Sequence, residues 1–570
     1  MKVTRPKRTF LPDNFIIDQW KNVEPFFIDL ENRSIDTKAE FEKWISDQSE
    51  LEAVVSEDLA WRYIKMTIDT KDKELADAYA FFVKEIQPHL EPYSFRLNKK
   101  LSASPFKSEF KDEAYKIYFR GVDTAIKLFR EENIPLNVEL AEKSQIHGAV
   151  SGAQSIEHGG EKITMQKASS LLKENDEVLR KSIFDKMAAR RAEDTEQLDD
   201  LFTELIQLRH KVATNAGYDN FRDYMFDELG RFDYTKEDCF DFHQSIKEEI
   251  VPLVKQISQK KAELMGKEQL KPWDSQVDPL GRAPLKPFKD GKELLDKTIV
   301  IFDKIDTYFG DCLRTMDSMG YLDLDSKDGK SPGGYNYPLY EIGVPFIFMN
   351  SVGSQRDLIT MIHEGGHAIQ SFLTRDLELT SFKSFPSEIA ELASMSMELL
   401  TMDYWNEFYD NQEDLKRAKI EQLETVLEVL PWVATIDEFQ HWIYENPTHS
   451  KEERKEKWIS LLDEYGTGTT DWTGYEDVRA YSWQRQLHLF EVPFYYIEYG
   501  MAQLGALAIW KNSKTDFKKT IKEYKKALAL GYTKSIPGVY EEANITFDFS
   551  KKNIKELAEF VGGELIINNG

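Results

Sequence analysis

The chain has 570 residues, and its 100 acidic and 74 basic side chains give a formal net charge of −26. So acidic a chain is a poor partner for the phosphate backbone of nucleic acids and for anionic lipid, since both require clustered positive charge. Hydrophobic residues make up 41% of the chain and aromatic residues 12%, which is typical of a globular protein. We therefore expect no nucleic-acid or membrane partner.

The cysteines and the N-terminal segment set further limits. Cys239 and Cys312 are far apart in the chain and lack CxxC spacing, so we expect neither a disulfide framework nor a cysteine-based zinc site. The basic segment 1–10 is not followed by the apolar stretch of a secretory signal. No apolar run approaches the length of about 18 residues that a membrane span requires. These features predict a cytoplasmic protein and leave its oligomeric state open.

Most of the chain has the periodicity of helices. Apolar positions recur every three or four residues at about 37–60 and 74–100. The longest such pattern, 167–213, contains no Pro or Gly and predicts a helical hairpin or one long connecting helix. After a loop rich in Gly and Ser at 326–337, the short apolar run 343–350 is the best candidate for a β-strand.

The segment His363-Glu-Gly-Gly-His367 has the pattern HExxH. Apolar residues around it recur at helical spacing, and Ser354 and Asp357 have the spacing of a helix-capping box. Residues four apart on a helix share a face, so both imidazoles can bind one metal ion. A zinc ion bound in this way polarises a carbonyl and lowers the pKa of its water to about 7. Glu364 can then accept the proton of the attacking water and deliver it to the leaving amine.

A catalytic zinc site needs a third protein ligand and an open position. A third histidine in the pattern HExxHxxGxxH would fall at position 373, which is Leu373, so that class of site is excluded. The next predicted helix instead carries Glu388, Glu391 and Glu398 on one face. One of these carboxylates could bind the metal while another orients a ligating histidine. Their spacing alone does not choose among them.

A later aromatic cluster is a candidate for contacts with the transition state. His488, Tyr496 and Tyr499 can each donate a hydrogen bond to the oxyanion that forms when water attacks a peptide carbonyl. Tyr496 and Tyr499 are about one helical turn apart. The alternative is that these rings pack in the core and that their polar atoms bond to the backbone.

Four segments in this order resemble the thimet oligopeptidase family of zinc metallopeptidases, and in particular its oligoendopeptidase F branch. They are Pro345–Asn350, the HExxH helix, Ser387–Ser394 and His488–Tyr499. The resemblance covers residues 345–500. HExxH alone occurs in many zinc hydrolases, whereas the four segments in this order are much more specific.

The resemblance implies three ligands for a single zinc ion, which are His363, His367 and Glu391. It also implies that Glu364 is the general base. Glu398 is implied to contact one of the zinc ligands and not the zinc ion itself. Glu391 is preferred over Glu388 because it begins an E-x-x-S segment like that of the family.

The resemblance further implies that His488, Tyr496 and Tyr499 contact the substrate or the oxyanion. The spacing from the histidine to the tyrosines differs by about a residue from the thimet-type pattern. Tyr495 therefore remains a candidate beside the other two tyrosines.

The family's architecture is mainly α-helical, with an elongated two-lobed body around a deep substrate channel and a small zincin-like β-sheet beside the HExxH helix. We expect residues 1–200 to form an N-terminal helical domain that makes one channel wall, and residues 201–570 to form the catalytic domain. An edge strand of the sheet can hold an extended peptide through main-chain hydrogen bonds.

The function implied by the resemblance is a zinc-dependent endopeptidase that hydrolyses internal bonds of short, unstructured oligopeptides. Two other functions are compatible with the residues: an exopeptidase that recognises a peptide terminus, and a helical binding protein with structural zinc. The second is disfavoured because Glu364 is intact and only three ligands are apparent, whereas structural zinc usually has four. The sequence does not specify the cleavage preference, the peptide length limit or whether another divalent metal can replace zinc.

Overall fold

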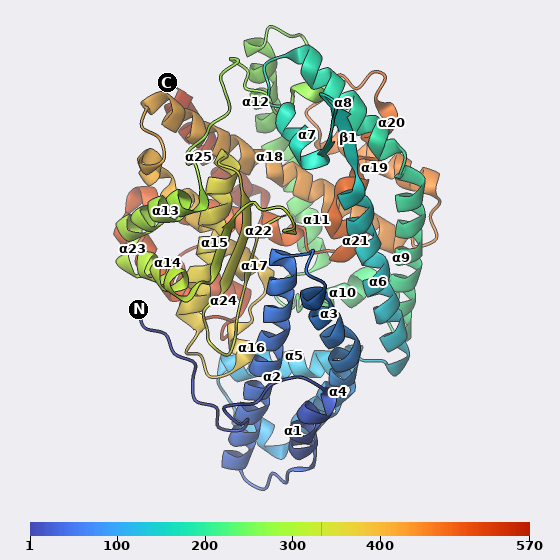
Figure 1. Ribbon diagram of the computed structural model, residues 1–570, viewed down its shortest axis with the longest axis vertical. Coiled ribbons are helices and arrows are strands. Elements are labelled where there is room, and N and C mark those ends of the chain that lie inside the picture. Colours follow the sequence, from blue (N-terminus) through green and yellow to red (C-terminus); the bar gives the residue numbers. More distant parts are fainter. Residues whose placement is uncertain (332, 570) are drawn as a thin grey trace. The chain divides into compact units, whose positions relative to one another are not determined.

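The computed structural model describes residues 1–331 and 333–569 and is mainly helical, as predicted (Figure 1). The chain divides into two compact units, each made of three separate segments. The first unit comprises Met1–Phe129, Lys286–Leu415 and Ala502–Phe547, and the second comprises Arg130–Leu285, Lys416–Met501 and the chain from Asp548 onward. The expected boundary at residue 200 falls within a helix of the second unit.

The first unit contains helices from all three of its segments, together with one three-stranded sheet. Its helices are α1 (Trp20–Asn32), α2 (Lys38–Ile68), α3 (Lys73–Phe81), α4 (Gln87–Ser102), α5 (Glu113–Leu128), α13 (Gly291–Ile305), α14 (Thr307–Met319), α15 (Gln355–Thr374), α16 (Thr380–Lys383), α17 (Ser387–Thr401), α23 (Phe517–Ala529) and α24 (Ile536–Glu542). Its strands are β3 (Leu322–Asp325), β4 (Tyr335–Tyr337) and β5 (Phe346–Ser351).

The second unit contains further helices and one β-hairpin. Its helices are α6 (Ile134–Ala153), α7 (Met165–Leu171), α8 (Glu177–Ala192), α9 (Thr195–Asn215), α10 (Phe221–Glu228), α11 (Lys236–Ser245), α12 (Val251–Leu264), α19 (Lys451–Tyr465), α20 (Glu476–Ala480), α21 (Leu487–Glu491) and α25 (Lys551–Asn569). The hairpin pairs β1 (Ser155–His158) with β2 (Glu161–Thr164). Two long helices, α18 (Gln412–Glu445) and α22 (Ile497–Thr515), contribute residues to both units.

Short helical turns of other types join these elements. The 3₁₀ turns are η2 (Pro105–Glu109), η3 (Glu131–Asn133), η5 (Pro272–Asp274), η6 (Met402–Glu407) and η7 (Ser482–Arg485). Two π-type turns, η1 (Phe82–Ile86) and η4 (Ile246–Ile250), lie directly before α4 and α12. Each is followed by a proline at the second position of the next helix, Pro88 and Pro252. Because proline has no N–H for the i→i−4 ladder, the helix widens at these points.

The long helical pattern at 167–213 is not one continuous helix. It is divided among α7, α8 and α9. The Asp176 side chain accepts hydrogen bonds from the backbone N–H groups of Val178 and Leu179, and so caps the start of α8. An aspartate in this position satisfies backbone donors at a helix start, which favours a break in a segment that has neither proline nor glycine.

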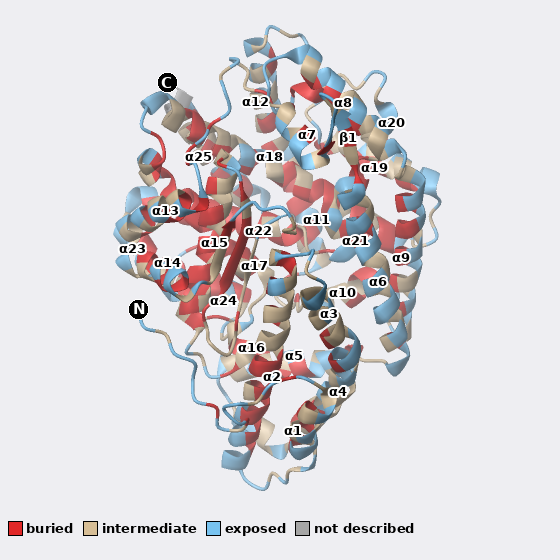
Figure 2. Ribbon diagram, viewed as in Figure 1, coloured by how far each residue is buried: buried red, intermediate tan, exposed pale blue. Residues whose placement is uncertain are grey.

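The three-stranded sheet lies beside the HExxH helix. The strand order is β3-β5-β4, with β5 parallel to β3 and antiparallel to β4. The predicted strand at 343–350 corresponds to β5, which is buried and appears as a red strand beside α15 in Figure 2. Ala60 and Ile64 of α2 pack against Phe346 and Phe348 of the sheet. Pro332, within the predicted loop 326–337, lies outside the described residues.

The predicted HExxH helix is α15. Its N-terminus is closed by a capping box in which Ser354 accepts from the backbone of Asp357, whose side chain accepts from the backbone of Ser354. The following glutamate-rich segment forms α17, which begins at Ser387 and is buried along nearly its whole length. Within residues 1–331 and 333–569, every helix is too short or too polar to span a lipid bilayer.

Candidate metal centre

Helices α15 and α17 bring three potential metal ligands together. The rings of His363 and His367 lie 4.9 Å apart at an interplanar angle of 85°. Oε2 of Glu391 is 3.2 Å from Nε2 of His363 and 3.8 Å from Nε2 of His367. One donor atom from each of the three residues lies within 4.8 Å of the others. These are the three residues that the resemblance names as zinc ligands.

A glycine allows the two helices to approach this closely. A Cβ atom built on Gly366 would lie 2.6 Å from Cα of Ser394 and 2.8 Å from the carbonyl oxygen of Ala393, both in the backbone of α17. Any side chain at this position would therefore push the helices apart. The hydroxyl of Tyr524 in α23 donates to the same Ala393 carbonyl at 2.6 Å, and so helps to hold α17 in place.

Each potential ligand is oriented by an outer partner. Nδ1 of His363 lies 2.7 Å from Oε1 of Glu398, and His367 is hydrogen-bonded to the backbone of Ala390. The hydroxyl of Ser394 donates to Oε2 of Glu391 at 3.2 Å. Such partners fix the tautomer and the ring orientation of a ligating histidine. The Glu398 contact is the arrangement that the sequence predicted for a carboxylate behind a ligand.

The cluster is open to solvent on the histidine side. The side chains of His363 and His367 are 20% and 17% exposed, whereas that of Glu391 is 6% exposed. Three protein ligands and an accessible position are characteristic of catalytic rather than structural zinc. Glu388, the other carboxylate considered, is buried outside this cluster, and its carbonyl accepts a hydrogen bond from Tyr540.

The donor set fits a zinc ion. Two imidazole nitrogens and one carboxylate oxygen, with a fourth position accessible, form the His₂Glu ligand set known for this metal. Each histidine also has the outer hydrogen bond that directs its other nitrogen towards the shared centre. The residues present are thus sufficient to hold one zinc ion.

Burial and charge shift the pKa values at this centre in different directions. Burial raises the pKa of Glu364 to about 7, and Glu391 adds to the increase. Burial also lowers the pKa of His367 to about 4. For His363 burial acts in the same sense, but the contacts with Glu391 and Glu398 outweigh it and raise the pKa well above its usual value. A carboxyl group that titrates near neutral pH is suited to exchange protons with water.

Strand β4 is attached directly to the HExxH helix. The amide of Asn336 donates to the backbone carbonyl of Glu364 at 3.2 Å. Neither Asn336 nor the role of Ser394 was identified from the sequence. The contact of Asn336 has no local signal because it crosses between elements. The spacing of Ser394, three residues after Glu391, was noted as part of the E-x-x-S segment, but its hydrogen bond to the Glu391 carboxylate was not predicted.

The second predicted cluster belongs to the second unit. The ring of His488 lies 4.9 Å from that of Tyr496 and 5.9 Å from that of Tyr499, and Tyr495 lies 6.1 Å away. The sequence prediction that these residues form a group is consistent with this geometry, which does not choose among the three tyrosines. Burial raises the pKa of Tyr496, so its hydroxyl keeps its proton at neutral pH.

A short chain of hydrogen bonds determines the tautomer of His488. The indole of Trp432 donates to Oε1 of Gln486 at 3.0 Å, and Nε2 of Gln486 contacts Nδ1 of His488 at 2.7 Å. Because an amide nitrogen only donates, Nδ1 is the acceptor. The neutral ring of His488 therefore carries its proton on Nε2, which can act as a hydrogen-bond donor.

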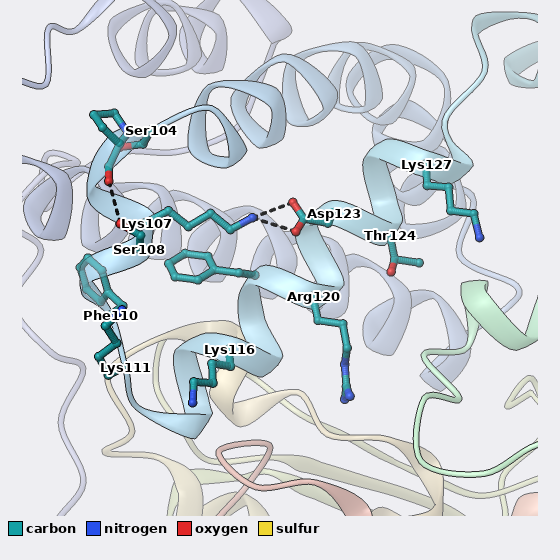
Figure 3. Close-up of a pocket in the computed structure, with 12 residues that line it drawn as sticks. Ser104, Lys107, Ser108, Phe110, Lys111, Lys116, Arg120, Asp123, Thr124 and Lys127 are labelled. Atoms are coloured by element: carbon teal, nitrogen blue, oxygen red, sulfur yellow. Dashed lines mark hydrogen bonds and ion pairs between the residues drawn. The ribbon is translucent and has the colours of Figure 1, made fainter.

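A surface depression of about 910 Å³ occurs elsewhere in the first unit, between η2 and α5 (Figure 3). The charged residues of its lining are mostly basic, in contrast to the net charge of the chain. The charged residues that line it are Lys107, Lys111, Lys116, Arg120, Asp123 and Lys127. Lys107 is paired with Asp123 at 2.8 Å, and no residue of the candidate metal centre lines this depression.

The helical fold and the His₂Glu cluster on an HExxH helix together define a zincin-like metallopeptidase. The chain belongs to peptidase family M3. The sequence model described as "Peptidase family M3" matches residues 170–559, and that of the "Peptidase M3 N-terminal domain" matches residues 12–129. Membership of this family implies a divalent metal ion.

Individual curated relatives match this chain at low sequence identity. The chain is 23% identical over 410 residues to an "Oligoendopeptidase F homolog" of Lactococcus lactis, covering 69% of this chain and 66% of that protein. It is 26% identical over 240 residues to a homologue of the same description from Borreliella burgdorferi, covering 41% and 39%. The alignments thus span less than two thirds of these curated relatives. A solved structure of "PZ peptidase A" with an inhibitor superposes with a TM-score of 0.90 at 25% identity, covering 100% of this chain and 98% of that chain.

Proposed function

We propose that this protein is a zinc endopeptidase of the oligoendopeptidase F type, which cleaves internal bonds of short, unstructured oligopeptides. The observation that carries the proposal is the cluster of His363, His367 and Glu391 beside the buried Glu364, in a chain that belongs to peptidase family M3. The descriptions of its relatives as oligoendopeptidases support the choice of branch and substrate.

In this proposal each residue of the centre has a defined task. His363, His367 and Glu391 hold the metal, which when bound supplies Lewis acidity towards water and the scissile carbonyl. Glu364 accepts a proton from the attacking water and transfers it to the nitrogen of the leaving amine. Glu398 keeps the ring of His363 in one orientation and accepts the proton of Nδ1. The net result is addition of water across the peptide bond.

Strand β4 is proposed to bind the substrate backbone. In the described sheet β4 is an edge strand, paired with β5 on one side only, and Asn336 attaches it to the helix that carries Glu364. An extended peptide can add to such an edge through main-chain hydrogen bonds, which tolerate many side chains. This mode of binding supports a preference for unfolded peptides over folded proteins.

His488, Tyr496 and Tyr499 are proposed as donors to the substrate or the oxyanion. The support is the order of their segment in the family pattern and the protonated Nε2 of His488. Replacing one donor of this kind usually lowers kcat by about 100- to 1000-fold. We therefore expect His488→Ala to lower kcat strongly while zinc content stays at the wild-type value.

The decisive experiment compares wild type with Glu364→Gln on a quenched fluorescent peptide blocked at both ends. Wild type should cleave an internal bond and lose activity with chelator. The variant should retain zinc and lose about 100- to 10,000-fold in kcat, because it lacks the group that moves the proton. Zinc content is measured on the same samples.

Other outcomes would replace the proposal. If wild type holds zinc but cleaves only peptides with a free end, the protein is an exopeptidase. If it holds zinc and cleaves no member of a varied peptide library, a binding function is favoured. Unchanged activity of Glu364→Gln would contradict the assignment of the base.

A further inference from the structure

A second group of metal-ligand side chains lies in the second unit, between α11 and α18. Helix α11 carries Cys239 and His243, and helix α18 carries Asp437 and His441. Each pair has i,i+4 spacing, so both members lie on one face of their helix. The same spacing places the two histidines of HExxH on one face of α15. Cys239, Asp437 and His441 have donor atoms close enough to share one ion, and His243 is joined to them through Asp437.

The side chains of this group are close together. Nε2 of His243 lies 2.8 Å from Oδ2 of Asp437, and Nε2 of His441 lies 3.2 Å from the same oxygen. One donor atom each from Cys239, Asp437 and His441 lies within 4.8 Å of the others. The ligand atoms of a tetrahedral zinc ion, each about 2.0–2.3 Å from the metal, lie roughly 3.3–3.8 Å apart. The 2.8 Å contact between His243 and Asp437 is that of a hydrogen bond, and it would lengthen if an ion bound.

All four residues are buried and some of their polar atoms lack hydrogen-bond partners. The exposed fractions are 0% for Cys239 and Asp437, 2% for His441 and 4% for His243. Among the described atoms, Oδ1 of Asp437 and Nδ1 of His441 have no hydrogen-bond partner. Buried polar atoms without partners are rare in proteins, and an unseen ion is one of the recognised explanations.

Aromatic rings surround His441, and the charge of Arg222 also acts on it. The ring of His441 lies 5.0 Å from that of Phe240 and 5.4 Å from that of Phe494, with Phe226 at 6.3 Å. An ionised carboxylate in such surroundings requires compensation. A divalent cation bound by one thiolate, one carboxylate and two neutral imidazoles gives a site with no net charge.

We propose that Cys239, His243, Asp437 and His441 form a second metal site, which takes a zinc-like divalent ion and has a structural role. Four protein ligands close the coordination sphere, and closed sites of this kind join elements rather than activate water. This site would link α11 to α18. The sequence excluded a cysteine-based zinc site because no CxxC spacing is present; the ligands here come instead from two helices far apart in the chain.

The site would also support a strained segment. Phe494 has a positive φ of 66°, which is unfavourable for a bulky side chain, and its N–H donates to Gln440 of α18 at 2.6 Å. Its ring packs against His441. The next residues are Tyr495 and Tyr496, so a metal at His441 would stabilise the backbone conformation from which these tyrosines project.

The test uses cobalt, because a thiolate ligand gives cobalt a charge-transfer absorption band in the near ultraviolet and the centre at His363 contains no cysteine. The full-length protein is stripped with chelator, reloaded with Co²⁺, and examined for bound cobalt and for this band. Wild type should bind two cobalt ions per chain and show the band. His367→Ala should bind one fewer ion and keep the band.

Two cysteine variants complete the experiment. Cys239→Ser should bind one cobalt ion fewer than wild type and lose the band. Cys312→Ser is the matched control, since Cys312 is also buried but lies outside the group; it should behave as wild type. Wild type that binds one cobalt ion without the band would overturn the proposal and leave a buried His243–Asp437 pair. If Cys239→Ser does not fold, the cobalt content and the absorption band of wild type and His367→Ala still test the proposal.

Discussion

At the candidate metal centre each of the three potential ligands is held by a hydrogen bond to an outer partner. The ring of His363 is fixed by Glu398, that of His367 by the backbone of Ala390, and the carboxylate of Glu391 by Ser394. These contacts restrict the ligands before a metal ion binds. Less conformational freedom is then lost on binding, which raises affinity.

Glu398→Gln should weaken zinc binding about 10- to 100-fold, which is the usual effect of removing an outer partner of a ligating histidine. Glutamine keeps an acceptor oxygen but lacks the negative charge that stabilises the proton on Nδ1. Glu391→Gln should weaken binding further, because it removes the negative charge of a group that binds the metal directly. The measurement is competition for zinc with a chelating dye.

Glu388→Gln is the control for this pair, since Glu388 is buried in the same helix but outside the cluster. Its zinc affinity should stay near the wild-type value. A loss of affinity in Glu388→Gln together with none in Glu391→Gln would show that the wrong carboxylate has been assigned.

At the scale of elements, the centre depends on how closely α15 and α17 approach. The two central residues of HExxH are both glycine here, and their contacts differ. A Cβ on Gly366 would meet the backbone of α17, whereas a Cβ on Gly365 would meet the ring of Phe302 in α13 at 2.7 Å. Glycine weakens a helix, so its presence at both positions reflects packing on two faces of α15.

Gly366→Ala should lower the free energy of unfolding by about 1–3 kcal/mol, as expected for overpacking against a backbone that cannot move aside locally. It should also reduce zinc occupancy, because separation of the helices moves Glu391 away from the histidines. Both effects are measured together, by urea unfolding and by metal analysis.

Gly121→Ala serves as the matched comparison. Gly121 is exposed in the middle of α5, and a Cβ there would meet none of the described atoms within 4 Å. The same substitution should stabilise the protein by up to about 1 kcal/mol through helix propensity. Destabilisation by both alanines would indicate that the effect at position 366 is not due to the approach of α17.

At the scale of the whole molecule, the net charge of −26 acts on every charged substrate. Charge of one sign raises the local concentration of oppositely charged ligands and the rate at which they associate. For two blocked peptides with the same scissile bond and flanking charges of opposite sign, kcat/KM should be higher for the cationic peptide.

Salt distinguishes this effect from a specific contact. Raising the ionic strength from about 0.01 M to about 0.15 M shortens the Debye length from about 30 Å to about 8 Å and should reduce the ratio of the two kcat/KM values. A ratio that does not change with salt would contradict long-range steering and indicate a local charge at the binding site.

The sequence predicted the features that depend on neighbouring residues better than those that depend on contacts between distant segments. The capping box at Ser354 and the strand before α15 were predicted correctly, because both depend on neighbouring residues. The segment 167–213, predicted to form a helical hairpin or one long connecting helix, is divided among α7, α8 and α9. The capping aspartate Asp176 begins a new helix within a segment that has good helical propensity.

Local patterns were sufficient to identify an HExxH helix, a carboxylate helix after it and a mainly helical fold, because helical spacing depends only on residues a few positions apart. Spacing could not choose among Glu388, Glu391 and Glu398, since all three share one face of their helix. The choice depends on which of them lies level with His363 and His367 of α15, and the close contact of Gly366 with α17 helps to set that level. The pairing of Cys239 and His243 with Asp437 and His441 is also a tertiary property, because contacts between distant segments leave no pattern in the sequence of either.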